Sequence, residues 1–213
     1  LKKVTQLIKD GTHGTHERVK IGIPLISAKD VVSGQIHITN STPKIKNEEY
    51  LKIHKNYSIE KDDLLITLVG TLGRCALVKE VLQKFSAQRS VGIIRCNKDL
   101  IDSKFLYYAA ISNDFYRQLL LRSKSTAQAG VYLGELSKCV VPIPPLNEQK
   151  KIAAILTVID DIIFKHKLKL EKLELLKIAL REHFLTKGLF QEEYKETHLG
   201  KIPQSWEIKQ LKD

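Results

Sequence analysis

The sequence predicts an α+β protein, in which a mixed α/β domain is followed by one long helix that forms a coiled coil. Three observations support this fold class. Short apolar runs alternate with turn residues through the first part of the chain. A proline-rich stretch, VPIPP at 141–145, ends that region. From 147 to 187 the chain then contains neither Pro nor Gly and repeats apolar residues every seven positions.

The first part of the chain carries the pattern of a strand-rich domain with a few helices. Residues 102–123 have helical apolar spacing and predict two helices broken near Ser112 and Asn113. Residues 132–139 predict a short helical turn that leads into a strand at 140–143, where the domain is expected to end. The other expected strands are residues 19–26, 34–39, 63–70, 75–80 and 90–96.

The junction between domain and helix is marked by prolines. Pro142, Pro144 and Pro145 predict an extended exit, because each Pro fixes its own φ and disfavours the helical conformation in the residue before it. Asn147 is expected to cap the N-terminus of the helix and Gly188 to end it. At 1.5 Å per residue the helix would be about 60 Å long.

An apolar stripe runs along this helix and is interrupted in its middle by His166 and Lys169. A long helix cannot bury such a stripe against itself, so we expect a partner helix from a second copy or from another half of the protein. The two polar residues either form a layer that fixes the register of pairing or lie along the rim, with the Lys169 stem covering apolar surface. The expected pairing residues are Ile152, Ile155, Ile159, Ile162, Leu173, Leu176 and Leu180.

Positive charge is concentrated on the globular part. The 213 residues carry a formal net charge of +11. Residues 1–146 hold 22 Lys/Arg and 13 Asp/Glu, whereas residues 147–213 hold 13 Lys/Arg and 11 Asp/Glu. A polyanion is the expected partner of such a domain, with nucleic acid ahead of a membrane surface. A basic protein without such a partner is the alternative.

Cysteine usage and hydropathy bound the class of protein. Cys75, Cys96 and Cys139 are odd in number and widely spaced, which argues against a disulfide framework and a zinc site and predicts buried thiols in a reducing compartment. No run approaches the ~18 apolar residues that a membrane span needs. The N-terminus has neither an apolar signal-peptide core nor an initiator Met. We therefore expect a cytoplasmic protein, present here as a fragment.

The motifs of an enzyme are not found. His13 and His16 lie in a Gly/Thr loop without the helical HExxH context or a third acidic ligand beside them, which favours a polar loop facing DNA over a metal site. The GTLG stretch at 70–73 matches neither a P-loop nor a dinucleotide fingerprint. Asp62 and Asp63 are interpreted as a solvated turn. We expect no catalytic residue, no metal site and no cofactor in this chain.

A DNA-binding surface is the remaining function class. The candidate residues combine cations, which suit phosphates, with amide and hydroxyl groups that can bond to bases. Arg74 and Arg89 could instead pair with Asp62 or Asp63, and Gln88 could cap a turn. The candidates are Lys9, Thr12, His13, Thr15, His16, Arg18, Lys29, Arg74, Gln88, Arg89, Ser125 and Gln128.

The stretch VPIPPLNEQKKIAAIL at 141–156, followed by a long helix, resembles the conserved region of type I restriction–modification specificity subunits. LGKIPQSWEIKQLKD at 199–213 is similar to the lead-in that opens each of the two repeats in those subunits. The chain departs from the family in length, because it carries one recognition domain rather than two. Further segments similar to the recognition domains are residues 8–16, 23–36, 61–78, 85–95 and 125–136.

The resemblance implies a division of the chain and a function. Residues 1–143 would be a DNA target-recognition domain, 144–190 a Pro-initiated spacer and dimerisation helix, and 191–213 a linker with the start of a second repeat. The chain would read one half of a bipartite site on double-stranded DNA. Modification (methyltransferase) subunits, which bind S-adenosylmethionine, and restriction (translocase/nuclease) subunits would assemble on it. No membrane partner is expected.

Three alternatives to this reading stay open. The chain could be the DNA-reading region of a larger fused methyltransferase–nuclease. It could be a half-subunit that acts as a homodimer. It could also be a purely structural coiled-coil protein, although the basic excess on residues 1–146 speaks against that class.

Overall fold

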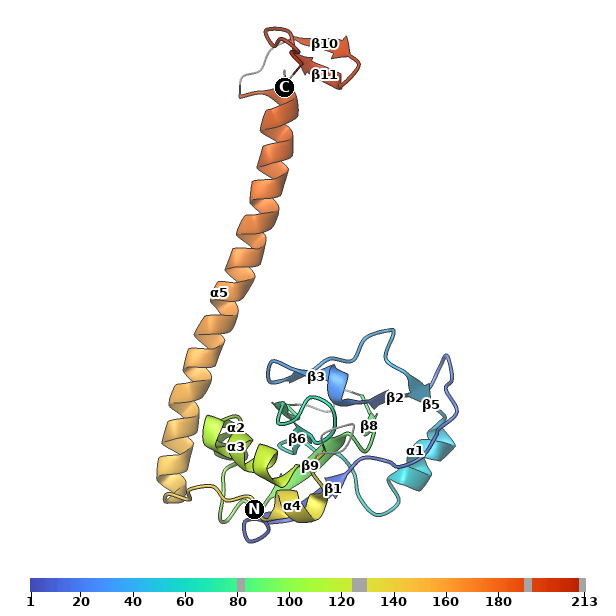
Figure 1. Cartoon of the computed structure of the whole chain (residues 1–213), viewed down its shortest axis with the longest axis vertical. Helices are drawn as coiled ribbons and strands as arrows, with labels where there is room; N and C mark the ends of the chain where they lie inside the picture. The colour runs from blue at the N-terminus through green and yellow to red at the C-terminus, as the bar shows by residue number, and fades with distance from the viewer. Residues whose placement is uncertain (80–82, 124–129, 190–192, 211–213) are drawn as a thin grey trace. The chain divides into compact units, whose positions relative to one another are not determined.

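The structure, a computed structural model, describes residues 1–79, 83–123, 130–189 and 193–210. It divides into two compact units, Leu1–Leu156 and Thr157–Asp213. The first unit contains several small sheets and short helices, and a 42-residue helix, α5 (Leu146–Lys187), continues from it into the second (Figure 1). The predicted α+β class with a long helix is confirmed.

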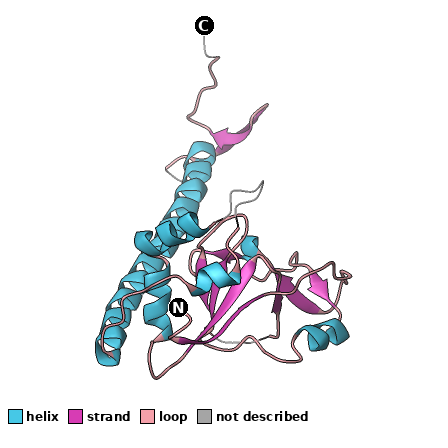
Figure 2. Cartoon of the chain, turned by 60° about the horizontal axis from the view of Figure 1, so that its bottom comes forward, coloured by secondary structure: helices cyan, strands magenta, loops and turns pink. Residues whose placement is uncertain are grey.

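The central sheet of the first unit is antiparallel, with the strand order β1-β9-β6-β7. Its inner strands, β6 and β9, are mostly apolar and almost entirely buried because both faces of the sheet are covered. Ile66 and Ile94 point to one core, whereas Leu65 and Ile93 point to the other, as the period-two alternation of a strand requires. The strands, drawn in magenta in Figure 2, are β1 (Thr5–Asp10), β6 (Leu64–Thr67), β7 (Cys75–Leu77) and β9 (Val91–Cys96).

A second, smaller sheet contributes to one of these cores. Its strand β2 (Ile23–Ile26) pairs antiparallel with β5 (Lys44–Ile45) and parallel with β8 (Ser86–Ala87). Sequence patterns missed β1, β5, β8 and the helix α1, because these elements are short or lack a run of apolar residues. The remaining elements before residue 60 are the 3-10 helix η1 (Ala28–Asp30), β3 (Val31–Val32), β4 (Gln35–Ile36) and α1 (Asn47–Ile53).

Helices α2 (Ser103–Ala110) and α3 (Asn113–Arg122) confirm the predicted pair and its break. The side chain of Asp102 caps α2 by accepting the N–H of Phe105, and Ser112 caps α3 by accepting that of Phe115. The short helix α4 (Leu133–Ser137) confirms the expected helical turn.

The predicted strand at 140–143 is wrong. These residues form neither a helix nor a strand. The N–H of Val140 donates to Oε1 of Gln118 at 2.8 Å, and the Gln118 amide donates back to the Val140 carbonyl at 2.9 Å. A side-chain amide on α3 therefore supplies the hydrogen bonds that a neighbouring strand would have given.

Helix α5 begins one residue earlier than expected. The carbonyl of Pro145 accepts the N–H groups of Glu148 and Gln149, so Asn147 lies within the first turn and is not the cap. The predicted end is confirmed, because Gly188 has a φ of +73° and donates its N–H to the carbonyl of Phe184.

The second unit consists of the rest of α5 and a hairpin formed by β10 (Tyr194–Thr197) and β11 (Gly200–Pro203). Every residue from 158 to 187 is exposed. Within the described ranges, no helix is long and apolar enough to cross a membrane.

Candidate nucleic-acid interface

The register of the central sheet gathers the predicted loops at one edge. Asp10, the last residue of β1, pairs with Gly92, and Thr67, the last residue of β6, pairs with Val91. The ends of β1 and β6 therefore lie beside the start of β9. The chain segments that leave the sheet here are residues 11–18, 68–74 and 88–90, which contain most of the predicted DNA-binding residues.

Backbone contacts hold the segments 11–18 and 88–90 together. The N–H of Thr12 donates to the Ala87 carbonyl at 2.7 Å, and the N–H of Arg89 donates to the Thr12 carbonyl at 3.0 Å. Gly11 permits this approach, because a Cβ at that position would collide with the carbonyl oxygens of Ala87 and Gln88. Thr12, Gln88 and Arg89 are thus neighbours in space, although about 75 residues separate them in sequence.

Two further segments join the same edge. The N–H of Ala28 donates to Oγ of Ser90 at 3.2 Å, which places the adjacent exposed Lys29 there. The N–H of Leu68 donates to the Ser90 carbonyl at 2.8 Å. The structure therefore brings Lys29 and the loop after β6 to the candidate interface.

The loop at 68–74 is organised by a buried threonine. The hydroxyl of Thr67 donates to the Thr71 carbonyl and accepts the N–H of Arg74 at 3.0 Å. The side chain of Arg74 is exposed. The loop thus presents a cation from a fixed backbone.

Arg74 and Arg89 do not pair with the acidic residues considered as their alternative partners. Asp63 is fully buried and bonds to Arg95, with Oδ2 at 2.8 Å from Nη2, and Asp62 lies 3.3 Å from the Lys98 ammonium. These acids precede β6 and so lie at the opposite edge of the sheet. The interpretation of Asp63 as a solvated residue is wrong, because Arg95 on β9 compensates its burial.

The residues of the first loop have different environments. Thr15 and Arg18 are exposed, as is His13, whose Nε2 lies 2.7 Å from Asp10 Oδ2. The side chain of His16 is only 8% exposed. DNA could therefore reach His13, Thr15 and Arg18, whereas His16 is enclosed by protein.

Lys9 and Gln88 are the remaining predicted residues in the described ranges. The ammonium of Lys9, a residue of β1, lies 4.6 Å from the centre of the Tyr57 ring, which is a cation–π contact within the domain. Gln88 closes a turn through its backbone carbonyl, which accepts the Val91 N–H at 2.9 Å. Ser125 and Gln128 lie outside the described residues. Nearby Gly130 forms a β-bridge with Val69 in the second loop.

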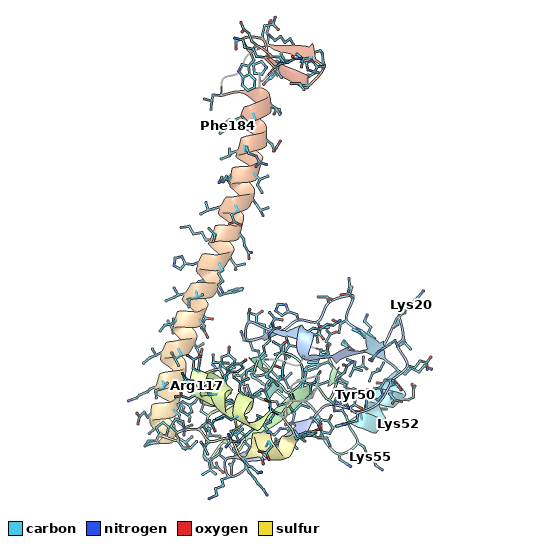
Figure 3. All side chains as sticks on the ribbon, viewed as in Figure 1. Lys20, Tyr50, Lys52, Lys55, Arg117 and Phe184 are labelled. Carbon is cyan, nitrogen blue, oxygen red and sulfur yellow. The ribbon has the colours of Figure 1, made fainter. Side chains whose placement is uncertain are left out.

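The sequence missed helix α1 as part of this region. Its signal is electrostatic, with Glu48 and Glu49 in the first turn and Lys52 in the last, which favours a helix through its dipole. Lys52 and Lys55 point away from the domain, whereas Tyr50 is buried on the inner side (Figure 3). Lys52 on the helix and Lys55 just after it add exposed cations next to the predicted loops, and the inner face of the helix packs on the domain.

The cysteines are confirmed as free, buried thiols. Burial raises the pKa of Cys75 to about 12 and that of Cys96 to about 12, so both stay protonated at neutral pH. In the part of the chain that the structure describes, no three His, Cys, Asp or Glu side chains are grouped as metal ligands.

The pairing residues predicted on α5 fall into two groups. Ile152 packs partly against the core of the first unit, whereas the other six are 41–62% exposed. A second, interrupted apolar stripe lies on the opposite side of the helix, about 160° from the first, at positions two or five after Ile159, His166, Leu173 and Leu180. Its members, 40–68% exposed, are Phe164, Leu168, Leu175, Ile178 and Leu185. Asp161, Glu171 and Glu182 lie on the same side.

Comparison with known proteins decides the family. The type I restriction modification DNA specificity domain matches residues 8–175, most of the chain. The chain belongs to this family. The resemblance of this chain, with its single recognition domain and long helix, to type I specificity subunits is thereby confirmed. The family is one of DNA specificity domains rather than of catalytic domains.

Two curated relatives are similar to the specificity chain. A putative type I restriction enzyme MjaX specificity subunit of Methanocaldococcus jannaschii is 26% identical and aligns with 99% of this chain and 50% of its own. The EcoBI specificity subunit of Escherichia coli is 31% identical over 63% of this chain and 28% of its own. The chain thus spans half or less of the length of these relatives.

A solved structure supports the fold of the specificity chain. The HsdS subunit of Thermoanaerobacter tengcongensis superimposes with a TM-score of 0.55 at 18% identity, over 86% of this chain and 47% of that one. The shared features are the domain of small sheets and the long helix.

Proposed function

We propose that this specificity chain reads one half of a bipartite DNA site and performs no catalysis itself. The observation that carries the proposal is the convergence of residues 11–18, 68–74 and 88–90, with Lys29, at one edge of the central sheet. The exposed cations of these segments suit phosphates, and their hydroxyl and amide groups suit base edges. Residues 1–143 would act as the target-recognition domain.

Helix α5 would set the distance between two such domains. Residues 144–190 would form the spacer, and residues 191–213 would lead into a further repeat. The exposed first stripe is too large an apolar surface to leave in water, which supports pairing with a second helix of the same kind. A second copy of the chain can supply that helix.

Modification subunits and restriction subunits would assemble on this scaffold. The second apolar stripe supports contacts with helices other than the paired one, because a two-helix coil covers only one side of α5. S-adenosylmethionine would be bound by the modification subunits, since the chemistry of methyl transfer needs a cofactor pocket and a site for a flipped base.

The test is to exchange residues 1–143 for those of a relative that recognises a different site. The exchanged chain is combined with the modification subunits, and the methylated positions are mapped on random duplex DNA. We expect methylation to move to the half-site of the relative. Methylation that stays at the original sequence would place specificity elsewhere. The chain without its partners should neither bind S-adenosylmethionine nor transfer a methyl group.

A further inference from the structure

Helix α1 is fastened at each end to one of the candidate DNA-binding segments, and each fastening uses a histidine. Glu49, in the first turn, contacts His16 of the segment 11–18. His54, which follows the last turn, contacts Ser86, which lies two residues before Gln88. Neither contact involves the outward-facing cations of the helix.

At the first end, the contacts define the state of the imidazole. Nδ1 of His16 lies 2.8 Å from Oε1 of Glu49, and Nε2 lies 2.8 Å from Oγ1 of Thr12. A carboxylate can only accept, so Nδ1 carries the proton and donates it. In the neutral ring Nε2 then accepts from the Thr12 hydroxyl. Glu49 thereby fixes the ring of His16, and the ring fixes the side chain of Thr12.

At the second end, His54 is held between two aromatic rings. The centres of the Tyr50 and Tyr57 rings lie 4.4 Å and 4.6 Å from that of the imidazole. Nδ1 lies 3.2 Å from the Tyr57 carbonyl, which can only accept, so Nδ1 carries the proton here as well. Nε2 accepts from Oγ of Ser86 at 3.0 Å. Burial lowers the pKa of His54, which favours this neutral form.

The two fastened segments meet each other directly through the Thr12–Ala87 and Arg89–Thr12 backbone bonds. Helix α1 therefore connects the segments 11–18 and 86–90, which also contact each other directly. Displacing either end would move Thr12 or Gln88 relative to the sheet. Base readout requires side chains to be held within about 0.5 Å, whereas phosphate contacts tolerate larger shifts.

We propose that Glu49, His16 and His54 are positioning residues for DNA sequence discrimination, acting through Thr12 and the segment 86–90. This inference rests on the proposed DNA-reading function and extends it to residues that need not touch DNA. Loss of a fastening should lower the preference for the correct sequence while leaving salt-dependent binding to phosphates in place.

The test compares Glu49→Gln with Glu48→Gln in the full chain bound to its modification subunits. Both variants remove one negative charge from the same turn of α1, but Glu48 is exposed and does not contact His16. Glu49→Gln weakens the contact with His16, because a neutral amide oxygen accepts the Nδ1 proton less strongly than a carboxylate does. The probes are the duplex selected by the wild-type complex from a random library and its single-base variants. We expect Glu49→Gln to lose about tenfold in the ratio of affinities with an unchanged salt slope, and Glu48→Gln to keep the wild-type ratio.

A measurement that does not depend on DNA affinity and a second variant complete the test. Amide hydrogen exchange within residues 12–18 and 84–90 should accelerate in Glu49→Gln but not in Glu48→Gln. His54→Phe, which keeps the ring stack and loses the Ser86 bond, should lower discrimination without loss of the folded state in circular dichroism. Unchanged discrimination and exchange in both Glu49→Gln and His54→Phe would overturn the inference, as would equal losses in Glu48→Gln. A wild-type complex without any sequence preference would instead contradict the proposed function.

Discussion

The backbone N–H of Asp102 donates to Oε1 of Gln149 at 2.9 Å, which ties the first turn of α5 to the start of α2. The amide nitrogen of Gln149 donates to the carbonyls of Pro144, at 2.7 Å, and Leu100, at 3.1 Å. This side chain is fully buried, and Ala153 one turn later belongs to the core. The beginning of α5 is therefore part of the globular domain, so the helix cannot rotate at its first turn without breaking these bonds.

Gln149→Ala should destabilise the first unit by about 2 kcal/mol, because it removes the buried side chain that bonds the partly buried N–H of Asp102 and carbonyl of Leu100. Urea unfolding followed by circular dichroism measures this change. Asn147→Ala is the matched control on the same turn of α5. Since Asn147 is exposed and is not the cap, its replacement should cost less than about 0.5 kcal/mol. Equal costs for the two variants would contradict the anchoring role of Gln149.

Ile159→Asp should prevent pairing of α5 with a second helix, because it places a carboxylate without a partner in the apolar seam. Sedimentation equilibrium at micromolar concentration should show a dimer for the wild-type chain and a monomer for the variant. Lys167→Asp introduces the same side chain outside both stripes and should leave the dimer intact. A folded wild-type monomer would refute the pairing.

Pairing of α5 with a second copy should be antiparallel, with His166 opposite Lys169 of the other helix. This register places Ile159 opposite Leu176 and Ile162 opposite Leu173, so the polar residues occupy two adjacent central layers and the apolar layers on either side remain intact. The chain that carries both Ile159→Cys and Leu176→Cys should form disulfide-linked dimers on mild oxidation, and either single variant should not. Cross-linking by Ile159→Cys alone would indicate a parallel pair.

Charge reversal at Arg74 or Arg89 should weaken DNA binding and reduce the slope of log affinity against log salt by about one for each lost phosphate contact. Reversal at Lys165 or Lys172, on the exposed part of α5, should have much less effect. Fluorescence anisotropy across a salt titration measures both slopes. Equal losses from the two pairs would contradict the assignment of DNA binding to the domain.

The stability of the first unit should fall in mild acid because of His54. Burial lowers the pKa of this histidine in the folded chain. The positive charge of Lys9 also lowers this pKa, whereas the hydrogen bond to the Tyr57 carbonyl raises it by less than burial lowers it. Below the ordinary histidine value of about 6.5 the unfolded chain therefore binds more protons, so stability is lost as the pH falls toward the lower folded value. The fall in Tm between about pH 7.5 and about pH 5 should shrink in His54→Phe and not in His37→Asn, which alters an exposed ring.

The sequence by itself determined the features that depend on local spacing. The apolar repeat and the absence of Pro and Gly predicted α5, and Gly188 predicted its end, because a helix is defined by contacts three and four residues apart. The break between α2 and α3 followed in the same way from Ser112. The proline junction also sufficed to indicate the family.

Only the tertiary structure decided which of the predicted polar residues lie together. Thr12 and Arg89 meet because β1 pairs with β9 in a particular register, and no local pattern records that register. Likewise the partner of Asp63 is Arg95 rather than Arg74, because residues directly across a strand pair are distant in sequence. Helix α1 is placed by the contacts of Glu49 with His16 and of His54 with Ser86, each pair more than 30 residues apart in sequence, so its proposed positioning role could not be derived from its own seven residues.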